Sequence, residues 1–220
     1  TGMPNKNHYT TARDIAVLSK NLIADYPKQY LRFSQKKYTY NNISQLNRNR
    51  LLTTYDFADG IKTGHTSSAG YCLAASASIN ETRFISVIFG ANSSKARFKD
   101  TKTLFKFGFR NFITEKYFNK NKVIAKERIW NGEKKYIDIG FNRNIYITQM
   151  KHDDSKIIPK INLLSKIQAP IRINQYLGTI DFVKDNKIIS TEKIYALKRI
   201  EEGNLYRKTY DYIANFFIEE

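Results

Sequence analysis

The sequence contains little cysteine and little histidine, and each shortage excludes a kind of site. Cys72 is the only cysteine, which rules out an internal disulfide and any cysteine-based zinc site. The three histidines, His8, His65 and His152, stand far apart and show no metal-ligand spacing. No apolar run approaches the roughly 20 residues that a membrane-spanning helix needs. We therefore expect no metal, no other cofactor and no helix that crosses a bilayer.

Acidic residues are also scarce, because 20 Asp and Glu stand against 37 Lys and Arg, a formal net charge of +17. Such a charge attracts polyanions such as nucleic acid, anionic lipid or an acidic polymer, and it says nothing about fold. The basic residues are scattered along the chain, and a drift in base composition explains them equally well. No recognition-helix or aromatic-basic motif is present, so we expect no nucleic-acid partner.

The first half of the chain mixes helical and strand patterns. Apolar residues recur at helical spacing over 10–25, and Thr11-Ala12-Arg13-Asp14 has the form of a capping box. A second helix is predicted after Ser93-Ser94. The segment 70–90 is nearly continuous in apolar and small residues, so we expect both faces of that strand pair to be covered. Strands are predicted at 38–40, 61–63, 70–79 and 83–90.

The second half of the chain is richer in strand patterns. From 122 to 200, short β-type runs alternate with turn signals, which is typical of a small β-sandwich or barrel. Charge and Asn interrupt the apolar pattern at 115–121. We predict an α+β fold in three parts: a mixed domain over 1–116, a β-rich domain over 117–202 and a C-terminal helix over 203–220.

The predicted C-terminal helix is amphipathic. Its apolar residues fall on one side, and Arg207, Lys208 and Asp211 lie away from that side. Such a helix either lies in a membrane interface with its aromatic residues buried or packs against its own domain. The pattern leaves both interpretations open.

The stretch from Asp59 to Thr66, Asp-Gly-Ile-Lys-Thr-Gly-His-Thr, carries the clearest chemical signal. Lys-Thr-Gly is a signature of penicillin-binding proteins and class A β-lactamases, and here it ends a predicted strand. A strand edge can pair with an extended peptide through main-chain hydrogen bonds. Gly64 lacks a Cβ and lets a substrate approach the backbone closely. The N–H that follows Gly64 can serve an oxyanion hole.

The chain resembles the serine D-alanyl-D-alanine carboxypeptidases, the low-molecular-weight penicillin-binding proteins of peptidase family S11. The resemblance covers essentially the whole chain and keeps the family's order of segments. It lies at Thr1–Pro4, His8–Asp14, Gln45–Asn49, Asp59–Tyr71, Lys106–Arg110, Ala169–Ile171 and Gly178–Ile180.

The resemblance implies part of a β-lactamase-like transpeptidase domain, with antiparallel strands and packed helices, then a small all-β sandwich and an amphipathic helix. It implies an enzyme that removes the terminal D-alanine of peptidoglycan pentapeptides through an acyl-enzyme, and that β-lactam antibiotics acylate when its site is complete. It also implies a periplasmic protein held on the inner membrane surface by its last helix. Glu219 and Glu220 at the end of that helix oppose attachment to anionic lipid.

By position, the resemblance implies catalytic roles for Lys62, Thr63, Gly64 and His65, with the His65 N–H in the oxyanion hole. Thr66, Arg48 and Arg110 are implied as groups that recognise the terminal carboxylate, and the planar fork of an arginine suits that ligand. One residue departs from the family pattern: Arg50 stands where the family usually has glycine. We expect this bulky cation to alter the loop that presents Arg48.

The nucleophile motif Ser-x-x-Lys and the Ser-x-Asn motif of the family precede the point where this sequence begins, and Thr1 is expected to be an internal residue. Two chance matches occur. Ser34-Gln35-Lys36-Lys37 precedes a β-type run in polar surroundings, and Ser78-Ile79-Asn80 follows the Lys-Thr-Gly strand instead of preceding it. We therefore expect the chain alone to be inactive. The alternative is a non-catalytic module that binds cell wall or membrane.

Overall fold

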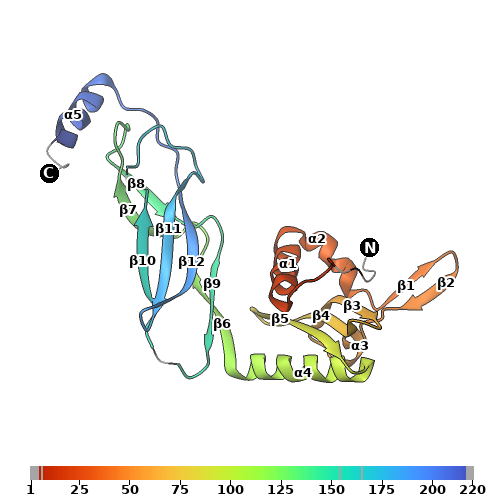
Figure 1. Cartoon of the computed structure of the whole chain (residues 1–220). Helices are drawn as coiled ribbons and strands as arrows, with labels where there is room; N and C mark the ends of the chain where they lie inside the picture. Colours follow the sequence, from red (N-terminus) through yellow and green to blue (C-terminus); the bar gives the residue numbers. More distant parts are fainter. Residues whose placement is uncertain (1–4, 6, 154, 165, 217–220) are drawn as a thin grey trace. The chain divides into compact units, whose positions relative to one another are not determined.

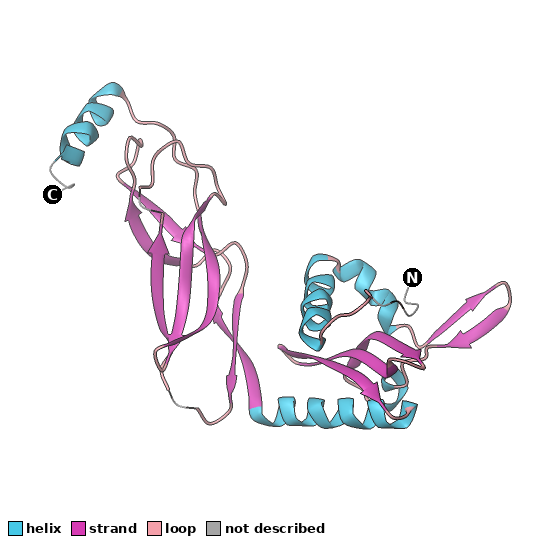
Figure 2. Cartoon of the chain, viewed as in Figure 1, coloured by secondary structure: helices cyan, strands magenta, loops and turns pink. Residues whose placement is uncertain are grey.

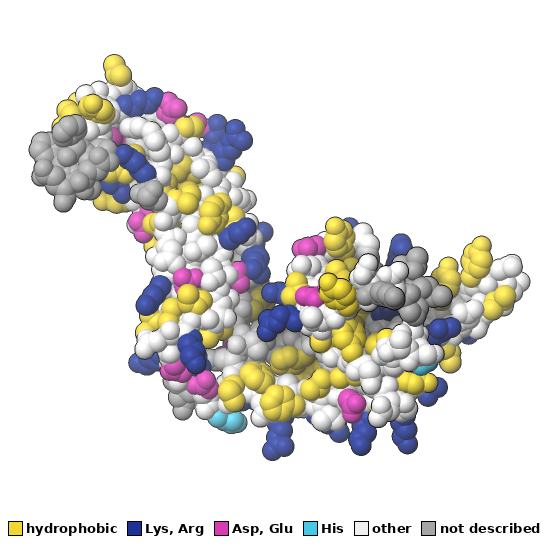
Figure 3. Space-filling model, in the orientation of Figure 1, with side chains coloured by type: hydrophobic (Ala, Val, Ile, Leu, Met, Phe, Trp, Pro, Cys, Tyr) yellow, Lys and Arg dark blue, Asp and Glu magenta, His cyan; other side chains and the backbone are white. Residues whose placement is uncertain are grey.

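The computed structural model describes residues 5, 7–153, 155–164 and 166–216, except for the side chains of residues 215 and 216. The chain forms two compact units (Figure 1): Thr1–Thr114 with Thr148–Lys151, and Glu115–Ile147 with His152–Glu220. Helices and antiparallel sheets occur together (Figure 2), which confirms the predicted α+β class. Lys and Arg side chains are spread over the visible surface of both units (Figure 3). None of the helices in the described part of the chain is long and apolar enough to cross a membrane.

Helix α1 (Ala12–Asp25) begins at the predicted capping box. The Asp14 N–H donates to the Thr11 hydroxyl at 3.1 Å, and the Thr11 N–H donates to the Asp14 carboxylate at 3.0 Å. Two donors at the start of the helix are thereby satisfied. The hydrogen bonds from Thr11 hold the pKa of Asp14 below its ordinary value.

Replacing Thr11 by alanine should let the first turn of α1 fray. Loss of a Ser or Thr N-cap generally costs about 1 kcal/mol, because an orphan helix N–H loses its acceptor. Urea unfolding followed by far-UV circular dichroism would measure the effect. Thr11→Asp retains a capping acceptor and should keep the original midpoint, whereas equal loss in both variants would contradict a capping role.

The first unit is built around an antiparallel sheet of β3 (Ala58–Thr66), β4 (Gly70–Ile79) and β5 (Thr82–Ala91), with β4 in the centre. Helix α4 (Ser94–Asn111) lies on one face of this sheet and α1 on the other (Figure 1). Both faces of the strand pair are thus covered, as its apolar pattern predicts. The core of this unit comprises Leu51, Leu73, Ala75, Ala77, Phe98 and Phe105.

Between α1 and β3 the chain forms short elements. Helices α2 (Pro27–Tyr30) and η1 (Leu31–Ser34) lead into a hairpin of β1 (Lys37–Tyr40) and β2 (Ile43–Leu46), and α3 (Leu51–Thr54) precedes β3. The sequence predicted β1 but not β2. Every residue of both strands is exposed, so β2 lacks the one-sided burial that produces a recognisable alternation.

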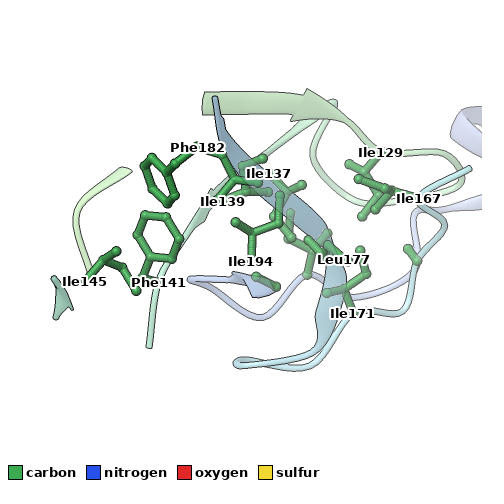
Figure 4. Close-up of a cluster of buried hydrophobic side chains, with 14 of the residues drawn as sticks. Ile129, Ile137, Ile139, Phe141, Ile145, Ile167, Ile171, Leu177, Phe182 and Ile194 are labelled. Carbon is green, nitrogen blue, oxygen red and sulfur yellow. The ribbon is translucent and has the colours of Figure 1, made fainter. Parts of the chain in front are cut away.

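The second unit contains a five-stranded antiparallel sheet in the order β10-β11-β12-β8-β7. A separate pair, β6 and β9, is divided between the units, since residues 112–114 and 148–150 belong to the first. The core of the second unit is dominated by isoleucine, with Phe141 and Phe182 fully buried (Figure 4). Branched aliphatic side chains suit a pleated, buried sheet face. The strands span Phe112–Phe118 (β6), Val123–Arg128 (β7), Tyr136–Gly140 (β8), Ile145–Met150 (β9), Ile158–Leu163 (β10), Tyr176–Lys184 (β11) and Lys187–Ala196 (β12).

Helix α5 (Leu205–Phe216) packs against the second unit through its polar side. Asp211 is 1% exposed and accepts hydrogen bonds from the Asn131 N–H at 2.8 Å and from Arg128 Nη2 at 3.1 Å. It also forms an ion pair with Arg207, whose Nη2 lies 3.2 Å away. The apolar side faces solvent, where Leu205 is 82% exposed. The helix therefore packs on its own domain and at the same time leaves its apolar side free.

Candidate active site

The Lys-Thr-Gly-His-Thr segment occupies the second half of β3. In the described part of the chain, β3 pairs with β4 alone and forms an edge of its sheet. Thr63 is buried, whereas Lys62 and His65 are exposed. The Lys62 ammonium donates to the Thr63 carbonyl at 2.6 Å. The segment thus presents a cation and an imidazole beside an open strand edge.

Arg97, on the first turn of α4, forms hydrogen bonds with both β3 and β4 at this segment. Its side chain is 7% exposed, and Nη1 donates to the carbonyl oxygens of Gly64 at 3.0 Å and Cys72 at 3.2 Å. Nη2 donates to the Ser94 hydroxyl at 3.3 Å. The guanidinium carbon lies 5.5 Å from the centre of the Tyr71 ring. Desolvation by burial is the main cause that lowers the pKa of Arg97 from its ordinary value.

The contacts of Arg97 fix which way the peptide groups of β3 point. Gly64 and Cys72 lie opposite each other, and both carbonyl oxygens approach one nitrogen atom, so the two carbonyls point toward each other. In an antiparallel ladder such hydrogen-bonded pairs alternate with pairs whose N–H and C=O groups point outward. His65 and Tyr71 form the next pair. The N–H and C=O of His65 therefore face the open edge.

Gly64 is not required by the packing of the chain itself. A Cβ added there would meet only the Cβ of Cys72 at 3.7 Å, an ordinary contact. Gly64 also does not adopt the positive φ that favours glycine. The absence of a side chain at this position leaves room on the edge for a group from outside.

Thr66 ends β3 and lines a cavity of about 510 Å³. Its hydroxyl accepts the Ala69 N–H at 3.0 Å and lies 3.2 Å from the Ser68 hydroxyl. His8 and Cys72 also line the cavity, and Cys72 is half-buried. Across the described residues, no three His, Cys, Asp or Glu side chains are close enough to hold a metal ion.

Arg48 lies on an exposed loop that its neighbour Asn49 ties to β3. Asn49 is 1% exposed, and its side-chain amide donates to the Gly60 carbonyl at 2.8 Å, two residues before Lys62. Asn47 donates to the Gln35 carbonyl at 3.0 Å. The loop that carries Arg48 is therefore fixed beside the strand that carries Lys62.

The other two arginines singled out in the sequence behave differently. Arg110 lies 13 residues beyond Arg97 on the same helix, a displacement of about 20 Å, and is not brought to the Lys62 segment. Its position gives no support to the predicted role in carboxylate recognition. Arg50 has helical dihedral angles, φ −63° and ψ −14°, so a residue with a side chain fits this part of the loop without strain.

The two serines that match the family's other motifs lie in unsuitable places. The Ser34 hydroxyl donates to the Leu31 carbonyl at 2.8 Å in a single 3₁₀ turn, and Lys37 lies on the exposed hairpin. Ser78 is six residues along β4 from Cys72, about 20 Å from the level of Gly64. Neither serine opens a buried helix with a lysine one turn further along.

Sequence reasoning missed Arg97 and Asn49. Both act by donating to backbone carbonyls of β3 that are distant in sequence, and no local pattern reveals such contacts. A weak signal existed for Asn49, since an asparagine between two arginines in a turn-rich stretch is suited to a loop-fixing hydrogen bond.

Comparisons with known proteins place these features in a family. Residues 1–93 match the family model described as D-alanyl-D-alanine carboxypeptidase, and residues 112–202 match the model of the penicillin-binding protein 5 C-terminal domain. The D-alanyl-D-alanine carboxypeptidase DacA of Escherichia coli K12 is 38% identical over 219 residues, covering 98% of this chain and 54% of the relative. DacF of Bacillus subtilis is 31% identical over 208 residues, covering 92% and 54%.

A solved structure, penicillin-binding protein 5 from Haemophilus influenzae, matches with a TM-score of 0.75 and 35% identity over 91% of this chain and 59% of that one. Penicillin-binding protein 6B from Escherichia coli matches with a TM-score of 0.57 and 30% identity, covering 86% and 50%. The chain spans about half the length of the curated relatives it matches. The chain therefore belongs to the D-alanyl-D-alanine carboxypeptidase family of the penicillin-binding protein 5 type.

Proposed function

We propose that this chain supplies one half of a serine D-alanyl-D-alanine carboxypeptidase site, which removes the terminal D-alanine of peptidoglycan pentapeptides. The open edge of β3 at His65 is the observation that carries the proposal. An extended peptide can add to this edge by main-chain hydrogen bonds. The glycine before His65, which the packing of the chain does not need, allows the peptide to approach closely.

In the proposed reaction, a serine hydroxyl attacks the carbonyl carbon between the two D-alanines, and the carbonyl oxygen becomes an oxyanion. The His65 N–H donates to that oxyanion as it forms. The C–N bond then breaks, D-alanine leaves as the protonated amine, and water hydrolyses the ester. Lys62 supplies positive charge beside the reacting serine, while Thr63, Thr66 and Arg48 direct donors to the terminal carboxylate.

The nucleophile of this proposal does not belong to these 220 residues. Ser34 and Ser78, the two matches in this chain, lie on a 3₁₀ turn and at the far end of β4. The chain alone is thus catalytically incomplete, and its function requires a Ser-x-x-Lys segment from elsewhere. A non-catalytic module that binds the cell wall is the competing function, and the following experiment separates the two.

Intact mass spectrometry after incubation with a penicillin tests the proposal. The chain alone should show no adduct. A fusion that places the nucleophile-bearing segment of the Escherichia coli relative ahead of Thr1 should gain one acyl group and release D-alanine from a D-Ala-D-Ala peptide. An adduct on the chain alone would locate the nucleophile here, and Ser34→Ala would identify it.

Within that fusion, Lys62→Ala should slow acylation by about a hundredfold to a thousandfold, the usual effect of removing one preorganised electrostatic group. Lys187→Ala, an exposed lysine of the second unit, is the matched control and should leave the rate unchanged. A folded fusion that binds cell wall without acylation would favour the non-catalytic module.

We also propose that the protein is periplasmic and lies on the outer surface of the inner membrane through α5. The exposed apolar side of α5 supports this, with Tyr206 81% exposed and Tyr212 73% exposed. Tyrosine suits the membrane interface, since its ring is apolar and its hydroxyl stays hydrated. Glu219 and Glu220, whose charges are expected to oppose attachment to anionic lipid, lie outside the described residues.

A further inference from the structure

A basic groove lies between α3 and α4 in the first unit, and none of its lining residues has a role in the reaction proposed above. It encloses about 550 Å³. In Figure 3, several dark blue side chains project along the part of the surface where Figure 1 draws α4. Eight residues line the groove: Arg50, Thr54, Lys95, Phe98, Lys99, Lys102, Thr103 and Lys106.

The four lysines of the groove form one stripe along α4. They are spaced by four, three and four residues, which places them within about 60° of one another around the helix. The stripe is about 17 Å long. Arg50 at the start of α3 contributes a fifth cation from the opposite wall.

These cations have no acidic partners. Among the described residues, no carboxylate lies within ion-pair distance of any of the five, whereas Lys184, Lys198 and Lys208 in the second unit each have one. Lys102 instead donates to the Thr54 carbonyl at 2.9 Å, which holds it at the groove wall. Five of the eight lining residues are cationic, compared with 37 of 220 in the chain, so the overall basic composition does not account for the cluster.

Like charges gathered in one concavity repel one another, and an anion in the groove would relieve that repulsion. Electrostatic repulsion from Arg50 contributes to lowering the pKa of Arg97. The departure of residue 50 from the family's usual glycine also adds a cation to this groove. Arg50 is thus the one cation of this groove that departs from the family pattern.

We propose that this groove binds a linear oligophosphate. Lysines act on phosphate as point charges, and an arginine can hold two phosphate oxygens with its planar fork. A chain of phosphates places several negative charges along one line, which matches the stripe of lysines. Phe98, the only apolar lining residue, is buried, so the groove offers neither a stacking surface for nucleic-acid bases nor an apolar rim for lipid chains.

Isothermal titration calorimetry of the whole chain with orthophosphate, pyrophosphate and tripolyphosphate would test the proposal. We expect saturable one-to-one binding of tripolyphosphate, with affinity that rises with the number of phosphates and falls as salt is added. A triple variant, Lys95→Gln with Lys99→Gln and Lys106→Gln, should weaken tripolyphosphate binding by about tenfold or more. Glutamine keeps the helix propensity of lysine, so α4 should remain folded.

The control is Lys116→Gln with Lys160→Gln and Lys187→Gln, which removes the same charge from exposed positions outside the groove. It should leave tripolyphosphate binding unchanged. Equal weakening in both triple variants would show diffuse attraction to the net charge and overturn the proposal. Absence of saturable tripolyphosphate binding would overturn it as well, including the case in which anionic vesicles or a single-stranded oligonucleotide bind through the same lysines.

Discussion

Replacing Arg97 by alanine should destabilise the first unit by about 2–4 kcal/mol, because a buried guanidinium that donates to two carbonyls and a hydroxyl is lost. The loss should also loosen the Gly64–His65 peptide group, since its carbonyl loses the Arg97 guanidinium as a donor. We therefore expect faster hydrogen exchange at the amides of β3 around His65. Far-UV circular dichroism during urea unfolding would measure the stability, and exchange detected by NMR would report the local effect.

The only tryptophan, Trp130, lies in the second unit and provides an internal reference for this measurement. Its fluorescence transition should stay in place in Arg97→Ala while the transition of the first unit moves to lower urea. Arg110→Ala removes the same kind of side chain from the exposed far end of α4 and should change little. Equal effects of the two substitutions would contradict a special role for Arg97 in holding β3.

Replacing Asp211 by alanine should detach α5 from the second unit. The change leaves Arg128 and Arg207 without their shared carboxylate, and breaking a buried ion pair from one side typically costs about 3–5 kcal/mol. The Asn131 N–H loses its acceptor as well. A helix of 12 residues is marginal in water on its own, so we expect the amides of α5 to lose their protection from exchange.

Trp130 should report the detachment directly, because it lines the same cavity as Asp211 and stacks under the Arg128 guanidinium at 4.1 Å. Asp100→Ala, an exposed aspartate of the first unit, is the matched control and should not change the fluorescence. Protected α5 amides in Asp211→Ala would contradict the proposed docking. Unchanged Trp130 emission in Asp211→Ala would also contradict the proposed docking.

The Asp211→Ala variant also distinguishes the docking of α5 on the second unit from the binding of α5 to a membrane. In liposome flotation, the intact chain should bind vesicles and a chain without residues 203–220 should not. Asp211→Ala should still bind, since its substitution leaves the apolar side of α5 intact. Equal flotation of the intact and shortened chains would contradict the membrane proposal.

Much of the fold followed from sequence because its elements are long and carry clear apolar or capping patterns. Strand β4 spans the predicted residues 70–79, and α1 and α4 begin next to their predicted caps. Strand β2 was missed because its hairpin is exposed on both sides. Its turn residues, Asn41 and Asn42, both adopt positive φ, the conformation of a tight hairpin turn, and this Asn-Asn signal was not recognised.

The candidate site was predictable only where its residues are contiguous. Lys62 to Thr66 share one strand, so their mutual placement follows from the strand itself. The arginines reach β3 through tertiary contacts, which local sequence does not encode. The resemblance to the family's last helix predicted a site role for Arg110. In the structure, Arg97, nearly four turns earlier on the same helix, is the arginine that contacts Gly64. The roles of the predicted site residues in the reaction stay predictions.

The boundary between the two units has a consequence for how the protein can be divided. The segment Thr148–Lys151 belongs to the first unit, although the chain before and after it belongs to the second. Lys151 donates to the carbonyls of Phe109 and Asn111, and the hydroxyls of Thr148 and Thr114 lie 2.8 Å apart. A single cut after Thr114 thus removes four residues from the first unit, and a protease that nicks the segment between 115 and 147 leaves that unit as two pieces held by hydrogen bonds and packing alone.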